Sequence, residues 1–297
     1  MKILIAGGTG FIGSEIVKAI LIENKHQVIV LSRDPKKVKV GEGRLGDVTR
    51  IETLKNKFGD IDVVIQCVQF PNHPVQNSSK GYTYEKYDAE GTENICYNVK
   101  DSKVQRIIYI SGAGTDSLRQ EPWFKAKVRA EKAVKETGKE FVILRPSWVY
   151  GPNDKSLNRF IDFAKHLPLM PVIGDGKSRV SPVFVQDLAQ LCLRAITVPP
   201  NAHETLDVGG PQVLTMNEVQ RLVLKLLGKN KPLVHQPLWL MKIAGSMMTK
   251  ILPNPPLSAE AIDFVNMDIP VDGRPVENLF NYEMKSLEDA LKSYIKA

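Results

Sequence analysis

MKILIAGGTGFIG, residues 1–13, contains a short apolar run that breaks into regularly spaced glycines. Residues 3–6 have the apolar character of a buried parallel strand. An apolar stripe at helical spacing follows, formed by Phe11, Ile12, Ile16, Val17, Ile20 and Leu21. Gly7 permits a tight turn off the strand, Gly10 lets a pyrophosphate approach bare backbone at a helix N-terminus, and Gly13 permits close helix–strand packing. In this context the spacing predicts a dinucleotide site rather than a plain glycine turn.

Length and composition indicate a soluble globular protein. The chain has 297 residues, 43% of them hydrophobic and 25% charged, which suits one large α/β domain or one domain with a smaller lobe. The net charge of +7 comes from dispersed lysines, and no basic stripe interleaved with aromatic residues suggests nucleic-acid binding.

The cysteines and hydropathy give further expectations. Cys67, Cys96 and Cys192 lie far apart and show no spacing typical of a metal site. We therefore expect no metal and a reduced, cytoplasmic setting. A signal peptide is not expected, and no apolar run reaches the roughly 18–20 residues of a membrane-spanning helix.

Strands and helices are expected to alternate along the first half of the chain. After the first strand, further strands are predicted at 27–31, 44–47, 61–68, 106–111 and 141–145. Helices are predicted at 47–58, 84–99 and 121–137. Such alternation indicates an α/β fold with a doubly wound parallel sheet of the Rossmann type.

The second half has a different texture, with frequent proline after Gly151. We expect a dinucleotide-binding domain at 1–150 and a smaller, partly interleaved lobe at 151–297, with segments near 181–209 returning to the sheet. Capping boxes at 215–218 and 286–289 predict two helix starts.

Motifs spread through nearly the whole chain resemble the short-chain dehydrogenase/reductase superfamily, in its extended or atypical branch. They are the glycine turn at 7–13, GDV at 46–48, DVVI at 62–65, GTxN at 91–94, KxxAE at 127–131, RPSxVYGP at 145–152, NRF at 158–160, PVFVxDLA at 182–189 and GGP at 209–211. Within the superfamily, residues 143–187 look most like the nucleotide-binding accessory subunit of respiratory complex I and its prokaryotic relatives.

The end of the second predicted strand favours NADP(H) over NAD(H). An NAD site usually places an acidic residue there to bond the ribose 2′-hydroxyl. Here Ser32 can bond a phosphate oxygen, and the planar fork of Arg33 matches a 2′-phosphate. The alternative is that Arg33 pairs with Asp34 or stacks on adenine while NAD binds.

The resemblance implies further cofactor contacts. Asp47 and Val48 would meet the adenine, Cys67, Val68 and Gln69 would line the ribose side, and Pro146 would meet the nicotinamide. The complete predicted set is Gly7, Gly8, Thr9, Gly10, Phe11, Ile12, Gly13, Ser32, Arg33, Asp47, Val48, Cys67, Val68, Gln69, Ser111, Lys127 and Pro146.

The residues expected to carry chemistry depart from the family's pattern. Reductases of the superfamily pair a tyrosine with a lysine four residues later, and Lys127 matches that lysine. Trp123 stands in the tyrosine position, and indole cannot donate and regain a proton near neutral pH. The usual serine position falls on Gly112, one residue after Ser111. Lys127 is therefore a candidate for bonding the nicotinamide ribose, for sole general acid, or for an ordinary surface lysine.

Other candidates lie after the fourth predicted strand. Tyr82, Tyr84 and Tyr87 are either substitute proton donors or packing residues, with packing favoured. His73 stands on a loop where doubly wound sheets bind ligands, so it is a candidate substrate contact.

Residues 237–253 form the most apolar stretch outside the predicted sheet. On a helix, Lys242, Ser246, Thr249 and Lys250 make one narrow polar stripe. The segment is too short to span a bilayer. It is expected to be a core helix with its stripe in water, a membrane-surface helix, a lid over an apolar molecule, or a contact for a membrane-associated partner.

Three functions follow from this sequence. The first is an atypical member of the superfamily that binds NADPH as a structural or respiratory-associated ligand without tyrosine-dependent hydride chemistry. The second is an NADPH-dependent reductase of an apolar carbonyl or quinone-like substrate. The third is a sensor that transmits NADP(H) occupancy to a protein partner.

Overall fold

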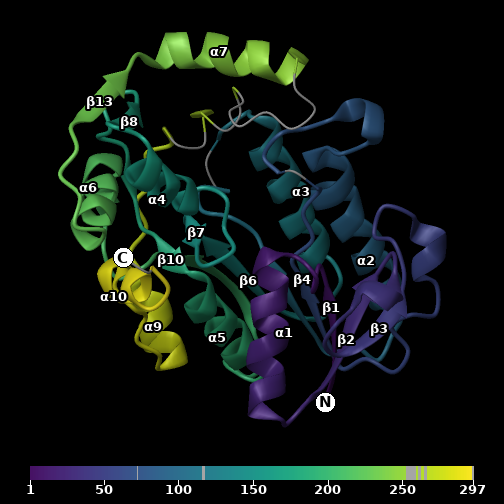
Figure 1. Ribbon diagram of the computed structural model, residues 1–297. Coiled ribbons are helices and arrows are strands. Elements are labelled where there is room, and N and C mark those ends of the chain that lie inside the picture. The colour runs from purple at the N-terminus through teal and green to yellow at the C-terminus, as the bar shows by residue number, and fades with distance from the viewer. Residues whose placement is uncertain (72, 116–117, 252–258, 260–261, 264–265, 296–297) are drawn as a thin grey trace.

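A parallel sheet lies at the centre of the computed structural model, which describes all residues except 72, 116–117, 252–258, 260–261, 264–265 and 296–297 (Figure 1). Seven strands of the described chain pair in the order β11-β6-β5-β4-β1-β2-β3. They are β1 (Lys2–Ala6), β2 (Gln27–Ser32), β3 (Glu42–Leu45), β4 (Val63–Gln66), β5 (Arg106–Ile110), β6 (Glu140–Pro146) and β11 (His203–Val208). Every neighbouring pair is parallel, which confirms the predicted α/β fold.

The strand order reverses direction beside β1. The chain runs from β1 outward through β2 and β3, and then returns to place β4 on the other side of β1. Ala6 of β1 is level with Leu31 on one side and Gln66 on the other. The carboxyl ends of the strands therefore open at one edge, where doubly wound sheets bind ligands.

Helices cover both faces of the sheet (Figure 1). On one face α1 (Phe11–Glu23) and α5 (Val185–Ala195) pack on Ile3 and Ile5 of β1. On the other face α2 (Gly91–Lys100) and α3 (Pro122–Lys135) pack on Leu4 and Ala6. Successive residues of a strand point to opposite faces, so an unbroken apolar strand supplies both cores.

Two predicted helices differ in form from the expectation. The helix expected at 47–58 is wrong, because only a short 3-10 helix, η2 (Ile51–Leu54), forms there. Asp47 instead accepts from the backbone N–H and the hydroxyl of Thr49, a local bond that competes with helix formation. The helix expected at 84–99 begins as a π-helical segment, η4 (Glu85–Glu90), before continuing as α2.

A third apolar core cluster lies around Tyr150, Phe184 and Val223, whereas Val276 and Phe280 belong to the cluster that covers one face of the sheet. Further helices and strands in the described ranges complete the fold. They are β7 (Val149–Tyr150), α4 (Leu157–His166), β8 (Met170–Ile173), β9 (Arg179–Val180), β10 (Val183–Phe184), β12 (Leu214–Thr215), α6 (Met216–Leu226), β13 (Leu233–Gln236), α7 (Leu238–Ile251), α9 (Arg274–Phe280) and α10 (Leu287–Lys292). The capping box at the start of α6 is confirmed, since Thr215 and Glu218 exchange both bonds.

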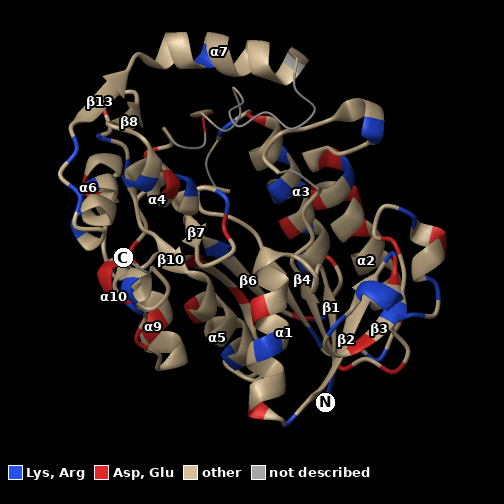
Figure 2. Cartoon of the chain, viewed as in Figure 1, with Lys and Arg blue, Asp and Glu red and all other residues tan. Residues whose placement is uncertain are grey.

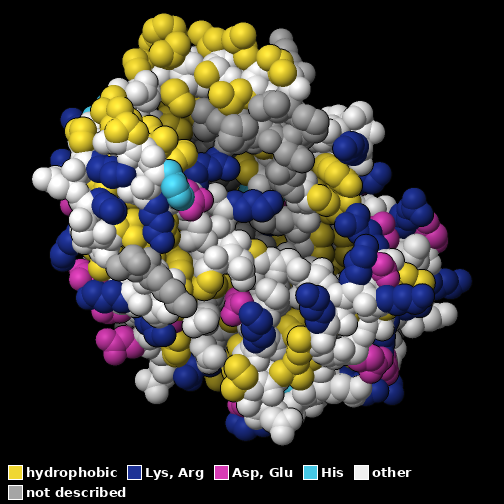
Figure 3. Space-filling view, viewed as in Figure 1, with side chains coloured by type: hydrophobic (Ala, Val, Ile, Leu, Met, Phe, Trp, Pro, Cys, Tyr) yellow, Lys and Arg dark blue, Asp and Glu magenta, His cyan; other side chains and the backbone are white. Residues whose placement is uncertain are grey.

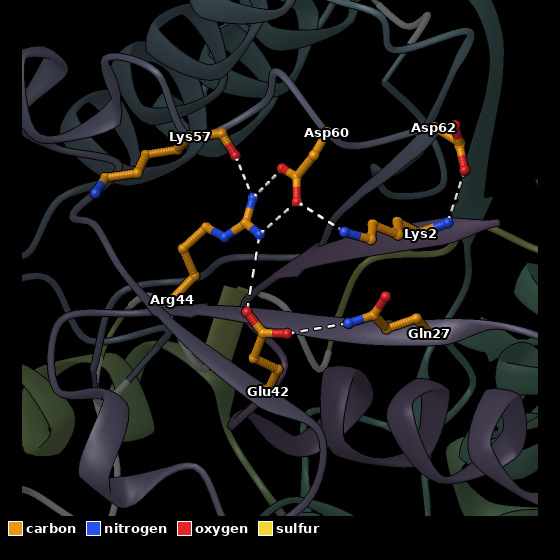
Figure 4. A network of polar contacts seen from close by, with 7 residues as sticks. All are labelled: Lys2, Gln27, Glu42, Arg44, Lys57, Asp60 and Asp62. Carbon is orange, nitrogen blue, oxygen red and sulfur yellow. Dashed lines mark hydrogen bonds and ion pairs between the residues drawn. The ribbon is translucent and has the colours of Figure 1, made fainter.

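A polar network ties together the amino ends of the first strands, opposite the ligand edge (Figure 4). Asp60 accepts from Arg44 at 2.7 Å and from the ammonium of Lys2 at 3.2 Å. Gln27 donates to Glu42 at 3.1 Å across β2 and β3. These groups hold the strands from the end that carries none of the predicted site residues.

Helix α7 lies at the periphery of the molecule (Figure 1). Trp239, Ile243 and Met247 have exposed fractions of 66%, 51% and 58%, and no described side chain of α7 belongs to a core cluster. Lys242 turns to Asp263, 2.6 Å away. The expectation of a core helix is therefore wrong, whereas Ser246 and Thr249 of its predicted polar stripe are exposed. Residues 252–253 of the predicted segment lie outside the described residues.

No helix in the described ranges is both long enough and apolar enough to span a bilayer.

Candidate functional site

Sequence-predicted site residues gather at the carboxyl edge of the sheet. The glycine turn follows β1, Ser32 ends β2, Asp47 follows β3, and Cys67 follows β4. Ser111 follows β5 and Pro146 ends β6. Residues from six strands that are distant in the sequence therefore meet along one edge because the strands are parallel.

The turn after β1 is shaped by contacts that only glycine can make. Gly7 has φ +90°, and a Cβ there would lie within 2.9 Å of backbone atoms of Cys67 and Val68. A Cβ on Gly13 would lie 2.2 Å from the carbonyl oxygen of Gly7. Gly10 is the N-cap of α1, and no side-chain bond caps that helix. The first-turn amides of α1 are therefore suited to an anion such as a pyrophosphate.

The loop after β2 leaves Arg33 and Asp34 in different positions. The Asp34 carboxylate accepts from the backbone N–H of Lys36 at 3.2 Å and pairs with Lys37 at 3.4 Å. It thereby caps the short helix η1 (Pro35–Lys37). Arg33 is exposed and donates to the phenol oxygen of Tyr87 at 3.2 Å. The acidic group is thus engaged by its own turn, whereas the guanidinium lies at the surface.

The loop after β3 is held from helix α2. Asn94 donates its side-chain amide to the carbonyl oxygen of Val48 at 2.9 Å. A Cβ on Gly91 would lie 3.0 Å from a methyl carbon of Val48. The glycine and asparagine of the GTxN motif therefore have a positioning role toward this loop, which sequence reasoning did not identify.

The segment after β4 begins with Cys67, whose backbone N–H donates to the carbonyl oxygen of Ala6 at 3.0 Å. Burial raises the pKa of the Cys67 thiol to about 12, so it is a neutral thiol near pH 7. Such a group can line a cleft but is a poor nucleophile. Val68 is half-buried and Gln69 is exposed.

Trp123 and Gly112 are in direct contact with each other. A Cβ built on Gly112 would lie 2.4 and 2.5 Å from two carbons of the six-membered ring of Trp123. The indole also packs edge-on against Phe124, with ring centroids 4.7 Å apart. The side chain that replaces the expected tyrosine therefore occupies the space that the expected serine side chain would need.

Lys127 lies in a buried polar cluster. Its ammonium is 2.8 Å from a carboxylate oxygen of Asp88 and donates to the phenol oxygen of Tyr109 at 3.3 Å and to the carbonyl oxygen of Ile110 at 3.2 Å. Only 2% of Lys127 is exposed, so the alternative of an ordinary surface lysine is wrong. Sequence reasoning missed Asp88, which the π-helical segment η4 brings under α3.

The protonation of Lys127 follows from these contacts. Burial by itself favours the neutral amine. The Asp88 carboxylate and the Tyr109 oxygen outweigh that effect and raise the pKa of Lys127. Two of the three ammonium donors bond the Tyr109 phenol and the Ile110 carbonyl, and the ammonium forms an ion pair with Asp88.

Ser111 belongs to a second buried network. Its hydroxyl donates to Glu131 at 2.6 Å, and Arg145 donates to both oxygens of the same carboxylate at 2.8 and 2.7 Å. The glutamate of KxxAE and the arginine of RPSxVYGP therefore join α3 to β6. The Ser111 hydroxyl is engaged by Glu131, and its predicted contact with the cofactor stays a prediction.

The loop candidates after β4 pack together. His73 lies against Phe70 and Tyr84, each with a centroid distance of 5.5 Å. Burial, with a smaller effect of the Lys127 charge, lowers the pKa of His73 to about 3, so the ring is neutral. Tyr84 donates to the carbonyl oxygen of Pro74 at 3.1 Å, while Tyr82 packs on the same cluster. Within the described residues, no group of three His, Cys, Asp or Glu side chains could hold a metal.

Comparisons with known proteins agree with this geometry. A profile of the NAD dependent epimerase/dehydratase family matches residues 3–209. Subunit 9 of the NADH dehydrogenase [ubiquinone] 1 alpha subcomplex from Arabidopsis thaliana is 25% identical, across 93% of this chain and 76% of its own length. UDP-glucose 4-epimerase from Vibrio cholerae is 28% identical, across 84% and 83%.

Among solved structures, UDP-glucuronic acid 4-epimerase from Bacillus cereus, in complex with UDP-glucuronic acid and NAD, superposes with a TM-score of 0.74. The match covers 98% of this chain and 97% of that chain at 19% identity. At that identity the likeness is one of fold.

Proposed function

The chain belongs to the NAD dependent epimerase/dehydratase family, and on that premise we propose that it holds NADP(H) as a bound ligand without the tyrosine-dependent proton relay. This membership confirms the superfamily predicted from the motifs. The nucleotide then acts as a structural or sensing ligand. The similarity to a subunit of NADH dehydrogenase supports a role beside a respiratory partner.

The contact between Trp123 and Gly112 carries this proposal. A reductase of the superfamily needs a phenol at the first position and a hydroxyl at the second, placed to exchange a proton with the substrate. Here the indole excludes any side chain at residue 112, because a Cβ there would lie 2.4 Å from the ring. An indole N–H donates but does not accept. The replacement of the tyrosine by Trp123 and the replacement of the serine by Gly112 therefore belong to one packing arrangement.

The preference for NADP(H) rests on the loop after β2. Arg33 is exposed and donates to the neutral phenol of Tyr87, so its fork remains suited to a 2′-phosphate. Asp34, the group that would favour NAD, is engaged with Lys36 and Lys37. The glycine turn and the first turn of α1 would hold the pyrophosphate. When bound, the nicotinamide supplies or accepts hydride.

A second candidate function is an NADPH-dependent reductase of an apolar carbonyl or quinone-like substrate. The observation that favours it is the pairing of Lys127 with the Tyr109 phenol at 3.3 Å, a pair of the type that the superfamily uses. The geometry weighs against it, because both groups are buried and Asp88 keeps Lys127 charged. Burial also raises the pKa of Tyr109 to about 12, which makes it a weak acid.

Turnover and thermal stability together test the proposal. The purified protein is mixed with NADPH and a panel of quinones and aldehydes, and absorbance of the reduced nicotinamide is followed. We expect no oxidation above background, together with a rise in Tm that depends on NADPH concentration, since a ligand at a hundred times its Kd stabilises by about 2.7 kcal/mol.

Two results would contradict it. Oxidation that disappears in the Lys127→Met/Asp88→Asn double variant, while that variant still binds NADPH, would favour the reductase. No Tm response to either nicotinamide coenzyme would reject the binding role itself.

A further inference from the structure

The chain carries a second surface that the nucleotide site does not explain. Helix α7 presents Trp239, Leu240, Ile243, Met247 and Ile251 with exposed fractions from 43% to 74%. On a helix, residues three, four, seven and eight apart share a face. Ile243, Met247 and Ile251 therefore continue the line that starts at Trp239. Figure 3 shows hydrophobic side chains along this helix at the edge of the molecule.

The inward face of α7 is different in character. Gly245 is buried, while Leu238, Met241, Ala244 and Met248 are half-buried. Lys242 pairs with Asp263 at the surface, with 2.6 Å between the charged groups. The larger apolar side chains Trp239, Ile243 and Met247 face solvent, together with Ser246 and Thr249. Transfer of those apolar side chains from water into an apolar environment would be favourable.

The charge of the segment that contains α7 indicates what kind of surface its apolar face binds. Residues 219–259 contain Arg221, Lys225, Lys229, Lys231, Lys242 and Lys250 and no aspartate or glutamate. This one segment carries +6, compared with +7 for the whole chain. Figure 2 shows α7 without an acidic residue. Two of these lysines pair with acids from outside the segment, Lys225 with Glu288 and Lys242 with Asp263. The segment still keeps an excess of positive charge, which is complementary to an anionic surface.

Basic side chains also gather on the segment that precedes the helix in the chain. A shallow groove of about 490 Å³ next to β13 is lined by Arg221, Leu224, Lys225, Lys229, Asn230, Lys231, Leu233 and His235. Its residues precede α7 directly in the chain and include four of the six basic residues of the segment. Lys229 and Arg221 are exposed. Phosphate groups are the natural ligands of such a cluster.

We propose that α7 lies flat on an anionic phospholipid bilayer, with its outer apolar face among the acyl chains and the basic groove against the headgroup phosphates. Helix α7 has 14 residues, so it is about 21 Å long and too short to cross a hydrocarbon core of about 30 Å. A single convex helix is also narrow compared with the roughly 800 Å² that each partner buries in a standard protein interface. Trp and Met on the apolar face with Lys and Arg beside it are typical of interfacial helices.

Vesicle sedimentation tests the apolar contact. The full chain, saturated with NADPH, is mixed with vesicles of phosphatidylcholine alone or of phosphatidylcholine and phosphatidylglycerol. We expect binding to the anionic vesicles, weakened by salt. The Trp239→Ser/Ile243→Ser/Met247→Ser variant should lose at least tenfold in partitioning. Ile22→Ser/Tyr97→Ser, which removes exposed apolar groups elsewhere, should bind like the wild type.

A second pair of variants tests the charge. Arg221→Gln/Lys229→Gln should weaken binding by about fivefold for each charge, since one basic residue near an anionic membrane contributes about 1 kcal/mol. Lys55→Gln/Lys103→Gln, which removes two exposed lysines outside the segment, should have no effect. Trp239→Phe should still sediment but lose the blue shift of tryptophan fluorescence that accompanies insertion.

Several outcomes would overturn the proposal. One is no sedimentation with anionic vesicles at low salt, and another is unchanged sedimentation of the triple variant. A third is that the wild type self-associates and does not bind vesicles, and that the triple variant no longer self-associates. The apolar face of α7 would then pack on a second copy of the chain. A cooperative thermal unfolding transition, measured for every variant without nucleotide, shows that the chain is folded and keeps this test separate from that of the nucleotide role.

Discussion

The two ends of the proposed cofactor site are built in different ways. At the phosphate end the turn is backbone against backbone, and Gly7 and Gly13 leave no room for a Cβ. At the nicotinamide end, side chains fill the space, with Trp123 against Gly112 and Lys127 on Asp88. The first end matches the glycine pattern that binds a dinucleotide. The second end departs from the residue pattern that supports hydride chemistry in the superfamily. Binding and chemistry can therefore be separated in one fold.

The largest effect should come from breaking the buried pair at the nicotinamide end. Lys127→Met leaves Asp88 as an unpaired buried charge, which should lower the free energy of unfolding by about 3–5 kcal/mol. Urea denaturation measures this. Lys127→Met/Asp88→Asn should recover most of the loss, and Lys132→Met, exposed on the same helix, should change little. A loss of NADPH affinity without loss of stability would mean that Lys127 serves the ribose rather than the protein.

The pH dependence of that loss gives an independent check. Asp88 raises the pKa of Lys127 above its ordinary value, which is about 10.4. The folded state therefore holds this proton more tightly than the unfolded state, and the stabilisation is complete below about pH 10. It decreases as pH rises through the folded-state pKa. The stability difference between wild type and the double variant should decrease as pH rises above about 10, and no decrease there would contradict the pairing.

At the phosphate end, Gly13→Ala should cost about 3 kcal/mol. The new methyl would lie 2.2 Å from the carbonyl oxygen of Gly7, so helix α1 must move away from β1. NADPH-dependent stabilisation should disappear with it, as measured by thermal unfolding. Gly59→Ala, where the same methyl meets nothing within 4 Å, should stay within about 0.5 kcal/mol of the wild type. Retained NADPH binding in Gly13→Ala would remove the glycine turn from the site.

A double-mutant cycle sharpens the contrast at the Trp123 contact. Gly112→Ala should cost about 2 kcal/mol by overpacking against the indole. Combining it with Trp123→Phe removes the ring atoms that clash, so the two changes should couple by at least about 1 kcal/mol. Urea denaturation of the four proteins measures the coupling. Additive losses would show that the two residues are independent.

The smallest effect concerns the 2′-phosphate. Arg33→Ala should weaken NADPH binding by about 1.5 kcal/mol, roughly tenfold, as expected for one hydrogen bond to a charged group. NADH binding should change much less, and stability should be unaffected. Titration of both coenzymes measures this, with Arg274→Ala in helix α9 as the control. Equal losses for the two coenzymes would reject the phosphate assignment.

Much of the phosphate end was predictable, because its determinants are local. Three glycines within seven residues, placed between a strand and a helix, specify a turn whatever the rest of the chain does. Arg33 and Asp34 were also visible in the sequence. The sequence did not show which of the two is bound by its neighbours, because that depends on the side-chain bonds of the η1 turn.

The nicotinamide end was only partly predictable. Lys127 and the absence of a nearby tyrosine could be identified from spacing. Asp88 could not, because it lies 39 positions before Lys127 and faces it through a π-helical turn that has no signal in hydrophobic periodicity. The outward face of α7 was missed for a similar reason. The sequence pattern placed only the polar stripe in water, whereas Trp239, Ile243 and Met247 are exposed as well.

The sequence alone determined the parallel sheet, the glycine turn and the absence of the usual tyrosine, because each depends on residue type at short spacing. The tertiary structure decided which buried charge Lys127 pairs with, how Trp123 and Gly112 share one space, and which side of α7 meets solvent. Those outcomes depend on contacts between segments far apart in the chain. Their energies come from burial and pairing that exist only once the segments have packed together.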